Sequence, residues 1–83
     1  MADVDDDTVA RWRASSRLAE RIAARIAAEL RGQPRWQPVQ GNFRLGARMG
    51  VSEGTARRAK ALLADHGAIM KDATGGTTGY FVS

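Results

Sequence analysis

The sequence predicts a small, mainly α-helical domain that ends in a β-hairpin. Three observations lead to this expectation. Apolar residues recur at helical spacing over residues 18–30, and the stretch 50–67 carries the start and stop signals of a further helix. Residues 68–83 then change to a strand–loop–strand pattern. A chain of 83 residues has the length of one compact domain.

Composition excludes several classes of protein. The chain has no cysteine, which rules out disulfides, cysteine-based zinc sites and thiol nucleophiles, and its single histidine cannot hold a metal alone. No nucleophile–base pair or phosphate-binding loop of the P-loop type is visible. No apolar run is long enough to span a membrane, and the acidic N-terminus is unlike a signal peptide. We therefore expect a non-enzymatic, cytoplasmic protein without metal, cofactor or membrane contact.

The charges are unevenly distributed along the chain. The net charge is +4, but four of the nine acidic residues lie within residues 1–7, and all 13 lysines and arginines follow Thr8. We expect residues 1–7 to form a mobile acidic tail and residues 8–83 to form a basic domain. A basic body of this kind is expected to attract polyanions.

The first helical pattern is an apolar stripe with a period of four residues. Its members are Leu18, Ile22, Ile26 and Leu30. Gly32 and Pro34 end the pattern. Val9 and Trp12 can extend the stripe backwards, which favours one helix over residues 8–31. The pair Ser15–Ser16 leaves the alternative of a break and two separate helices.

The middle of the chain predicts a connector followed by a short helix. Both prolines lie in the connector, where Trp36 is expected to form a lid on the core. Asn42 or Gly41 is expected to cap a short helix over residues 43–49. Gly50 then ends this helix in a position suited to positive φ.

The stretch "GVSEGTARRAKALLADHG" predicts a capped helix over residues 53–66. Ser52 is a typical N-cap, and Gly67 supplies the stop after His66, for which we expect a capping role. The inner stripe comprises Ala56, Ala59, Leu62 and Leu63. The outer face comprises Glu53, Gly54, Arg57, Arg58 and Ala61.

The end of the chain predicts two short strands. The stretch "AIMK" forms the first with Ile69 inward, residues 72–79 form a loop rich in turn residues, and "YFVS" returns. Helix, short helix, tight turn, longer helix and hairpin is the order of a winged helix-turn-helix, with three helices and a C-terminal wing. In that architecture helix 53–66 enters the DNA major groove, and wing 72–79 contacts the backbone or the minor groove.

Residues from about Leu18 to the C-terminus resemble the DNA-binding domain of GntR-type bacterial regulators. The resemblance rests on "LAERIAARI" and on "LGARMGVSEGTARRAKALLADHGAI", followed by a glycine-rich wing and "GYFV". It implies that Ser52, Thr55 and Arg57 contact DNA and that Gly75 or Gly76 forms the wing tip.

The sequence departs from the family pattern at four positions. Glu53 replaces a frequent arginine, Gly54 a frequent threonine, Phe43 an arginine, and Lys60 an apolar residue. These changes leave the expected fold intact but alter the expected target. Glu53 cannot contact guanine as an arginine does, although it can accept a hydrogen bond from a cytosine amino group.

We therefore expect sequence-specific binding of double-stranded DNA by a small bacterial transcriptional regulator. The candidate DNA-binding residues are Arg44, Ser52, Glu53, Gly54, Thr55, Arg57, Arg58, Lys71, Gly75, Gly76 and Thr77. The alternatives are a winged-helix protein-interaction module and a non-transcriptional DNA-binding accessory protein of a mobile element. Convergence of the arginines at 44, 48, 57 and 58 and of Lys71 on one face with the wing favours DNA, and scatter favours a protein partner.

Two expectations concern partners. No site for a small-molecule effector is visible in the sequence. A single module of this size makes few contacts with DNA, so we expect a weak homodimer that DNA strengthens, paired through Val9 and a partly exposed Trp12.

Overall fold

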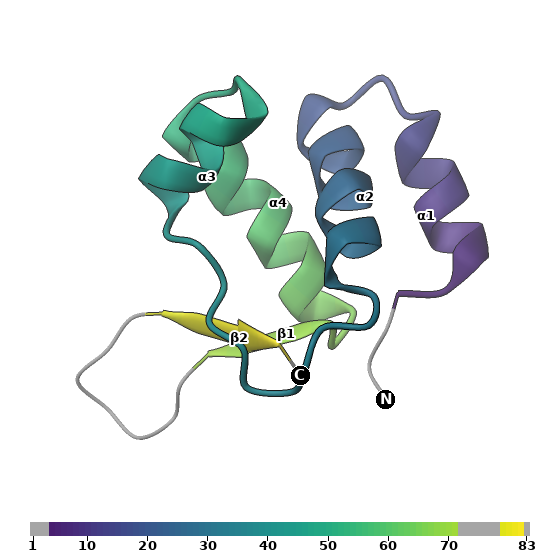
Figure 1. Cartoon of the computed structure of the whole chain (residues 1–83). Helices are drawn as coiled ribbons and strands as arrows, with labels where there is room; N and C mark the ends of the chain where they lie inside the picture. Colours follow the sequence, from purple (N-terminus) through teal and green to yellow (C-terminus); the bar gives the residue numbers. More distant parts are fainter. Residues whose placement is uncertain (1–3, 72–78, 83) are drawn as a thin grey trace.

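The computed structural model describes residues 4–71 and 79–82, and these residues form four helices and a two-stranded antiparallel sheet. In chain order the elements are α1 (Asp6–Arg13), α2 (Leu18–Leu30), α3 (Asn42–Met49), α4 (Glu53–Asp65), β1 (Ile69–Lys71) and β2 (Tyr80–Val82). Helix α2 lies between α1 and α4, α3 packs on α4, and the sheet lies across one end of the helices (Figure 1). The expectation of a mainly α-helical fold with a β-hairpin is confirmed, with one helix more than expected.

The domain begins before residue 8, where the sequence placed the end of a mobile tail. Val4 is buried in the core, and Asp5 is the N-cap of α1. The Asp5 carboxylate accepts hydrogen bonds from the backbone N–H of Thr8 at 2.8 Å and from its hydroxyl at 3.1 Å. These hydrogen bonds lower the pKa of Asp5, and the bond from the Thr8 backbone N–H has a larger effect than the bond from the Thr8 hydroxyl. Residues 4–7 therefore belong to the folded domain, and residues 1–3 lie outside the described residues.

A break at residues 14–17 separates α1 from α2, so the alternative of two helices is the correct one. The Ser15 hydroxyl accepts from the backbone N–H of Arg17 at 2.9 Å. The Arg21 guanidinium donates to the Ser15 carbonyl at 2.8 Å. Local side-chain bonds of this kind compete with helical backbone pairing, because they satisfy the same backbone groups.

The break lets α1 fold back against α2, and this packing buries its apolar face. Trp12 is only 6% exposed, and its ring lies edge-on to that of His66, with 5.0 Å between the centroids. Val9 is also buried. The expectation that Trp12 is partly exposed is therefore wrong, because α1 covers its own domain with this face. Trp12 is thus not available as the pairing surface that was expected for a weak homodimer, and the homodimer itself stays a prediction.

Helices α2 and α4 meet through small residues. Ala23 of α2 and Ala56 and Ala59 of α4 are completely buried, and Leu63 fills the space beside them. Small side chains allow two helix backbones to approach closely, and the larger Ile26 and Leu63 then pack in the gaps at close to crystalline density. This seam forms the centre of the core and fixes which face of α4 remains outside.

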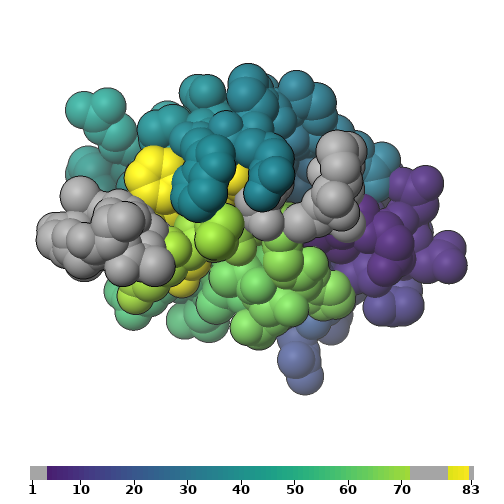
Figure 2. All heavy atoms as spheres, turned by 90° about the horizontal axis from the view of Figure 1, so that it is seen from below, coloured from purple at the N-terminus to yellow at the C-terminus, as the bar shows by residue number. Residues whose placement is uncertain are grey.

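The connector between α2 and α3, residues 31–41, extends the sheet by a third row of backbone pairing. The Trp36 and Val39 N–H groups donate to the carbonyls of Val82 and Tyr80, at 2.8 and 2.9 Å, and the Val82 N–H donates to Gln37 at 2.9 Å. β2 thus pairs with β1 and also with the connector at Pro38. Seen from below, the teal connector covers part of the yellow β2 (Figure 2). The sequence predicted only an extended segment here, because a segment that pairs over so few residues shows no alternation of apolar and polar side chains.

Trp36 is not the core lid that the sequence suggested. It is 57% exposed, it has a positive φ of 68°, and its ring centroid lies 6.3 Å from that of Phe81. The backbone N–H of Trp36 donates to the Val82 carbonyl of β2. This backbone pairing, rather than burial of the indole ring, therefore holds Trp36 in place.

The turn between α3 and α4 depends on a close backbone approach at Gly46. A Cβ atom on Gly46 would lie 2.8 Å from the Val51 carbonyl oxygen, closer than real Cβ atoms come. The Val51 N–H in turn donates to the Gly46 carbonyl at 2.9 Å. Gly50 has the expected positive φ, at 73°, and Ser52 is the expected N-cap of α4. Gly41, one of the two expected caps, is the N-cap of α3.

Lys60 joins three segments of the fold from a buried position. It is only 4% exposed, its ammonium donates to the Gln40 carbonyl at 2.9 Å, and it lies 5.1 Å from the centre of the Tyr80 ring. Burial lowers the pKa of Lys60, because removal from water disfavours the charged amine. Lys60 thus links α4, the connector and β2.

We predict that Gly46→Ala destabilises the protein by about 1–3 kcal/mol, the usual cost of forcing an extra group into a packed site. The matched control is Gly54→Ala in α4, whose Cβ would meet only the Arg58 guanidinium, at an ordinary 3.6 Å. We expect Gly54→Ala to stabilise the helix by roughly 0.5–1 kcal/mol, because alanine loses less backbone entropy. Urea denaturation of both variants checks this, and equal midpoints would contradict the close approach.

We predict that Lys60→Met alters the pH dependence of stability. At pH values between the lowered pKa of Lys60 in the folded protein and its ordinary pKa of 10.5, the unfolded chain holds a proton on this amine that the folded chain lacks. The stability of the wild type relative to Lys60→Met should therefore rise with pH in that alkaline range. Lys71→Met, which removes an exposed lysine, is the control. Parallel pH profiles for Lys60→Met and the wild type would show that the amine is not desolvated.

Candidate nucleic-acid interface

The outer face of α4 is the main exposed surface that the sequence assigned to binding. Glu53, Arg57 and Ala61 follow one another at intervals of four residues and are all exposed. Arg58 is exposed beside them, and Gly54 is half-buried. Since residues three or four apart share a helix face, these positions form a surface with long cationic and small side chains together. The expected division of α4 into inner and outer faces is confirmed.

Ser52 and Thr55 form a hydrogen-bonded cap at the start of this surface. The Ser52 hydroxyl accepts from the Thr55 backbone N–H at 3.1 Å and donates to the Thr55 hydroxyl at 3.0 Å. The Arg58 guanidinium donates to the same Thr55 hydroxyl at 3.2 Å. Thr55 is only 6% exposed, so it lies beneath the outer face rather than on it. The Thr55 hydroxyl accepts from both Ser52 and Arg58 and so orients the capping serine and the arginine. Ser52 itself is exposed.

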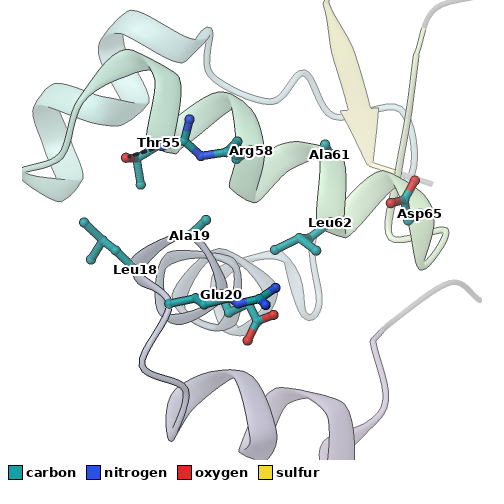
Figure 3. A pocket seen from close by; sticks show the side chains of 9 residues that line it. Leu18, Ala19, Glu20, Thr55, Arg58, Ala61, Leu62 and Asp65 are labelled. Carbon is teal, nitrogen blue, oxygen red and sulfur yellow. Dashed lines mark hydrogen bonds between the residues drawn. The ribbon is translucent and has the colours of Figure 1, made fainter.

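A groove of about 470 Å³ runs between the start of α2 and α4. Leu18, Ala19 and Glu20 form one wall, and α4 side chains from Thr55 to Asp65 form the other (Figure 3). The Thr55–Arg58 hydrogen bond lies at one end of it. The groove contains arginines and carboxylates together, so its charges compensate one another and favour no anion.

The arginines of α3 have different surroundings. Arg48 forms a two-pronged ion pair with Glu29, at 2.8 and 2.9 Å, and also donates to the Gln40 side chain at 2.6 Å. The hydrogen bonds that Arg48 donates to the Glu29 carboxylate raise the pKa of Arg48, so its positive charge is used in an ion pair between α2 and α3. Arg44 is exposed, and so is its neighbour Phe43, at 74%.

The predicted basic cluster is therefore only partly assembled. Arg57 and Arg58 share α4, and Arg44 is exposed on α3, but Arg48 is paired with Glu29. Lys71 is exposed at the end of β1. The wing-tip residues Gly75, Gly76 and Thr77 lie outside the described residues.

A second hollow, which the sequence analysis missed, is lined by three arginines. It has a volume of about 430 Å³ and lies between α1, α2 and the α3–α4 turn. Arg13 comes from α1, and Arg21 and Arg25 come from α2. The sequence contained one signal of this hollow: Arg21 and Arg25 are four residues apart, which puts them on one face of α2. The contribution of Arg13 could not be predicted, because Arg13 reaches the hollow only through the break at residues 14–17.

Two further findings apply to the described parts of the chain. No three His, Asp or Glu side chains gather there in a way that could hold a metal ion. None of the described helices combines the length and the apolar character needed to cross a membrane.

Comparison of the chain with models of protein families, with curated proteins and with solved structures finds no significant match.

We predict that Ser52→Ala destabilises the protein by about 1 kcal/mol, the typical loss on removing a helix N-cap. Ser52→Asn should restore most of the stability, because its side-chain oxygen can accept the same N–H. Thermal unfolding of the three proteins provides the measurement. A Ser52→Asn variant as unstable as Ser52→Ala would mean that the serine acts other than as a cap.

Proposed function

We propose that the protein binds double-stranded DNA sequence-specifically, as a winged helix-turn-helix with α4 as the recognition helix. The observation that carries this proposal is the combination of a tight α3–α4 turn with an exposed outer face of α4 that presents Arg57 and Arg58. An α-helix fits the major groove of DNA, and a helix that follows such a turn is the usual reader of base edges. The β1–β2 pair after α4 has the order of a wing.

The chemistry of the outer face suits a groove of DNA. Arginine can donate two parallel hydrogen bonds to a guanine edge or to a phosphate, and Arg57 is one of the two exposed arginines of α4. Gly54 and Ala61 have little side chain, so the helix backbone can approach a groove wall. Glu53 can accept from a cytosine amino group and repels phosphates, which would restrict the accepted sequences.

Within this proposal the protein is a small bacterial transcriptional regulator that works in the cytoplasm on the nucleoid, without enzymatic activity. Support for this role comes from the resemblance of residues 45–67 to GntR-type regulators and from the basic charge that follows Thr8. The same surface also fits a DNA-binding accessory protein of a mobile element.

A protein partner is the second candidate, and Phe43 is the observation that favours it. This phenylalanine is 74% exposed on α3, next to Arg44. Exposed aromatic residues beside arginine are typical anchors of protein interfaces. Phe43→Ala distinguishes the candidates, because it should abolish capture of a protein partner but change duplex affinity little.

The decisive experiment selects bound duplexes from a random pool and then measures the affinity of variants for the selected site. We predict that Arg57→Ala weakens specific binding by about 1–3 kcal/mol, the value of one good two-pronged base contact. Arg35→Ala, in the connector, removes an equal charge away from α4 and should change the specific affinity much less. Failure to enrich any sequence from the pool would reject the proposed function.

A further inference from the structure

The arginine-lined hollow has a charge distribution unlike that of the groove beside α4. Arg13, Arg21 and Arg25 line it, and the remaining lining residues are Leu18, Ile22, Met49, Gly50 and Val51. Among the described residues that line it, none carries a carboxylate. Three positive charges therefore face one concave, largely apolar surface without a compensating charge in its wall.

The two arginines of α2 are positioned by the helix and by the break before it. Arg21 and Arg25 are four residues apart, so they lie about one turn, or about 6 Å, from each other along α2. One guanidinium nitrogen of Arg21 donates to the Ser15 carbonyl at 2.8 Å. This hydrogen bond orients the guanidinium group, whose remaining N–H groups can donate to a ligand. The same break brings Arg13 to the hollow from the end of α1.

The neighbouring acidic residues of α2 lie elsewhere. Glu29 is paired with Arg48 of α3, and Glu20 lines the groove on the α4 side. Ile22 and Met49 form an apolar floor beneath the three arginines. A concave surface with charges of one sign and an apolar wall concentrates their electric field, which attracts anions. The planar guanidinium group matches the oxygens of phosphate in pairs, so phosphate is the anion that this set of donors fits best.

We propose that this hollow binds phosphate groups and that, in a DNA complex, these are backbone phosphates beside the recognition site. The second part rests on the proposed function. Gly50 and Val51 line the hollow and directly precede Ser52, the N-cap of α4. A duplex that engages the first turn of α4 therefore brings its backbone to the rim of the hollow. The three arginines would extend the contact from α4 across the turn to α1 and α2.

The test is the salt dependence of binding to a selected duplex and to a random one. Each phosphate contact contributes about 0.9 to the slope of log affinity against log salt. Arg13→Gln and Arg25→Gln should each reduce that slope by about 1 and weaken both duplexes to the same extent, so that the ratio of specific to non-specific affinity stays constant. Arg25→Lys and Arg35→Gln are the controls, and both should keep the wild-type slope. Unchanged slopes for Arg13→Gln and Arg25→Gln would overturn the backbone contact.

A titration with inorganic phosphate, without DNA, judges the hollow independently. We expect saturable shifts of the Gly50 and Val51 amide signals in the wild type and their loss in the double variant Arg13→Gln/Arg25→Gln. If phosphate shifts these signals but the salt slopes do not change, the hollow takes a free phosphate-bearing ligand and the backbone assignment is wrong. If neither changes, the phosphate site is rejected. A wild type that binds no duplex would reject the proposed function alone, since the phosphate titration still tests the hollow.

Discussion

The contact between Gly46 and the carbonyl of Val51 is the constraint on which the arrangement of the helices depends. It brings the end of α3 within backbone distance of the turn, and the reciprocal bond from the Val51 N–H closes the same loop. Gly50 supplies the left-handed residue that this path requires. The direction in which α4 leaves the turn and the position of the turn beside the arginine-lined hollow follow from this contact, whereas the α2–α4 seam fixes which face of α4 stays outside.

Features specified by neighbouring residues were predictable from the sequence. The Ser52 cap, the positive φ values of Gly50 and Gly67, and the inward side of Ile69 all depend on local chemistry and short periodicity. Features that depend on contacts between distant segments were not predictable. The burial of Trp12 needs α1 to fold back, which a long amphipathic stripe does not indicate.

The features of the candidate site divide in the same way into those that the sequence could predict and those that it could not. The outer face of α4 was readable because a helix repeats every 3.6 residues, so burial of Ala56 and Ala59 exposes Arg57. The roles of Thr55 and Arg48 were not readable, because each is decided by a hydrogen-bond partner rather than by its place on the helix. The arginine-lined hollow combines two helices and a turn, so no single stretch of sequence contains it.

The backbone bonds between the connector and β2 join residues 36–39 to residues 80–82 and therefore close a loop that contains α3 and α4. The helices form from local contacts, whereas this closure must first overcome the entropy of a long chain segment. The pairing of the connector with β2 should accordingly form later than the individual helices and the local β1–β2 pair, and the buried amine of Lys60 links this pairing to α4. The pairing that completes the sheet thus depends on the helices that lie between its two segments.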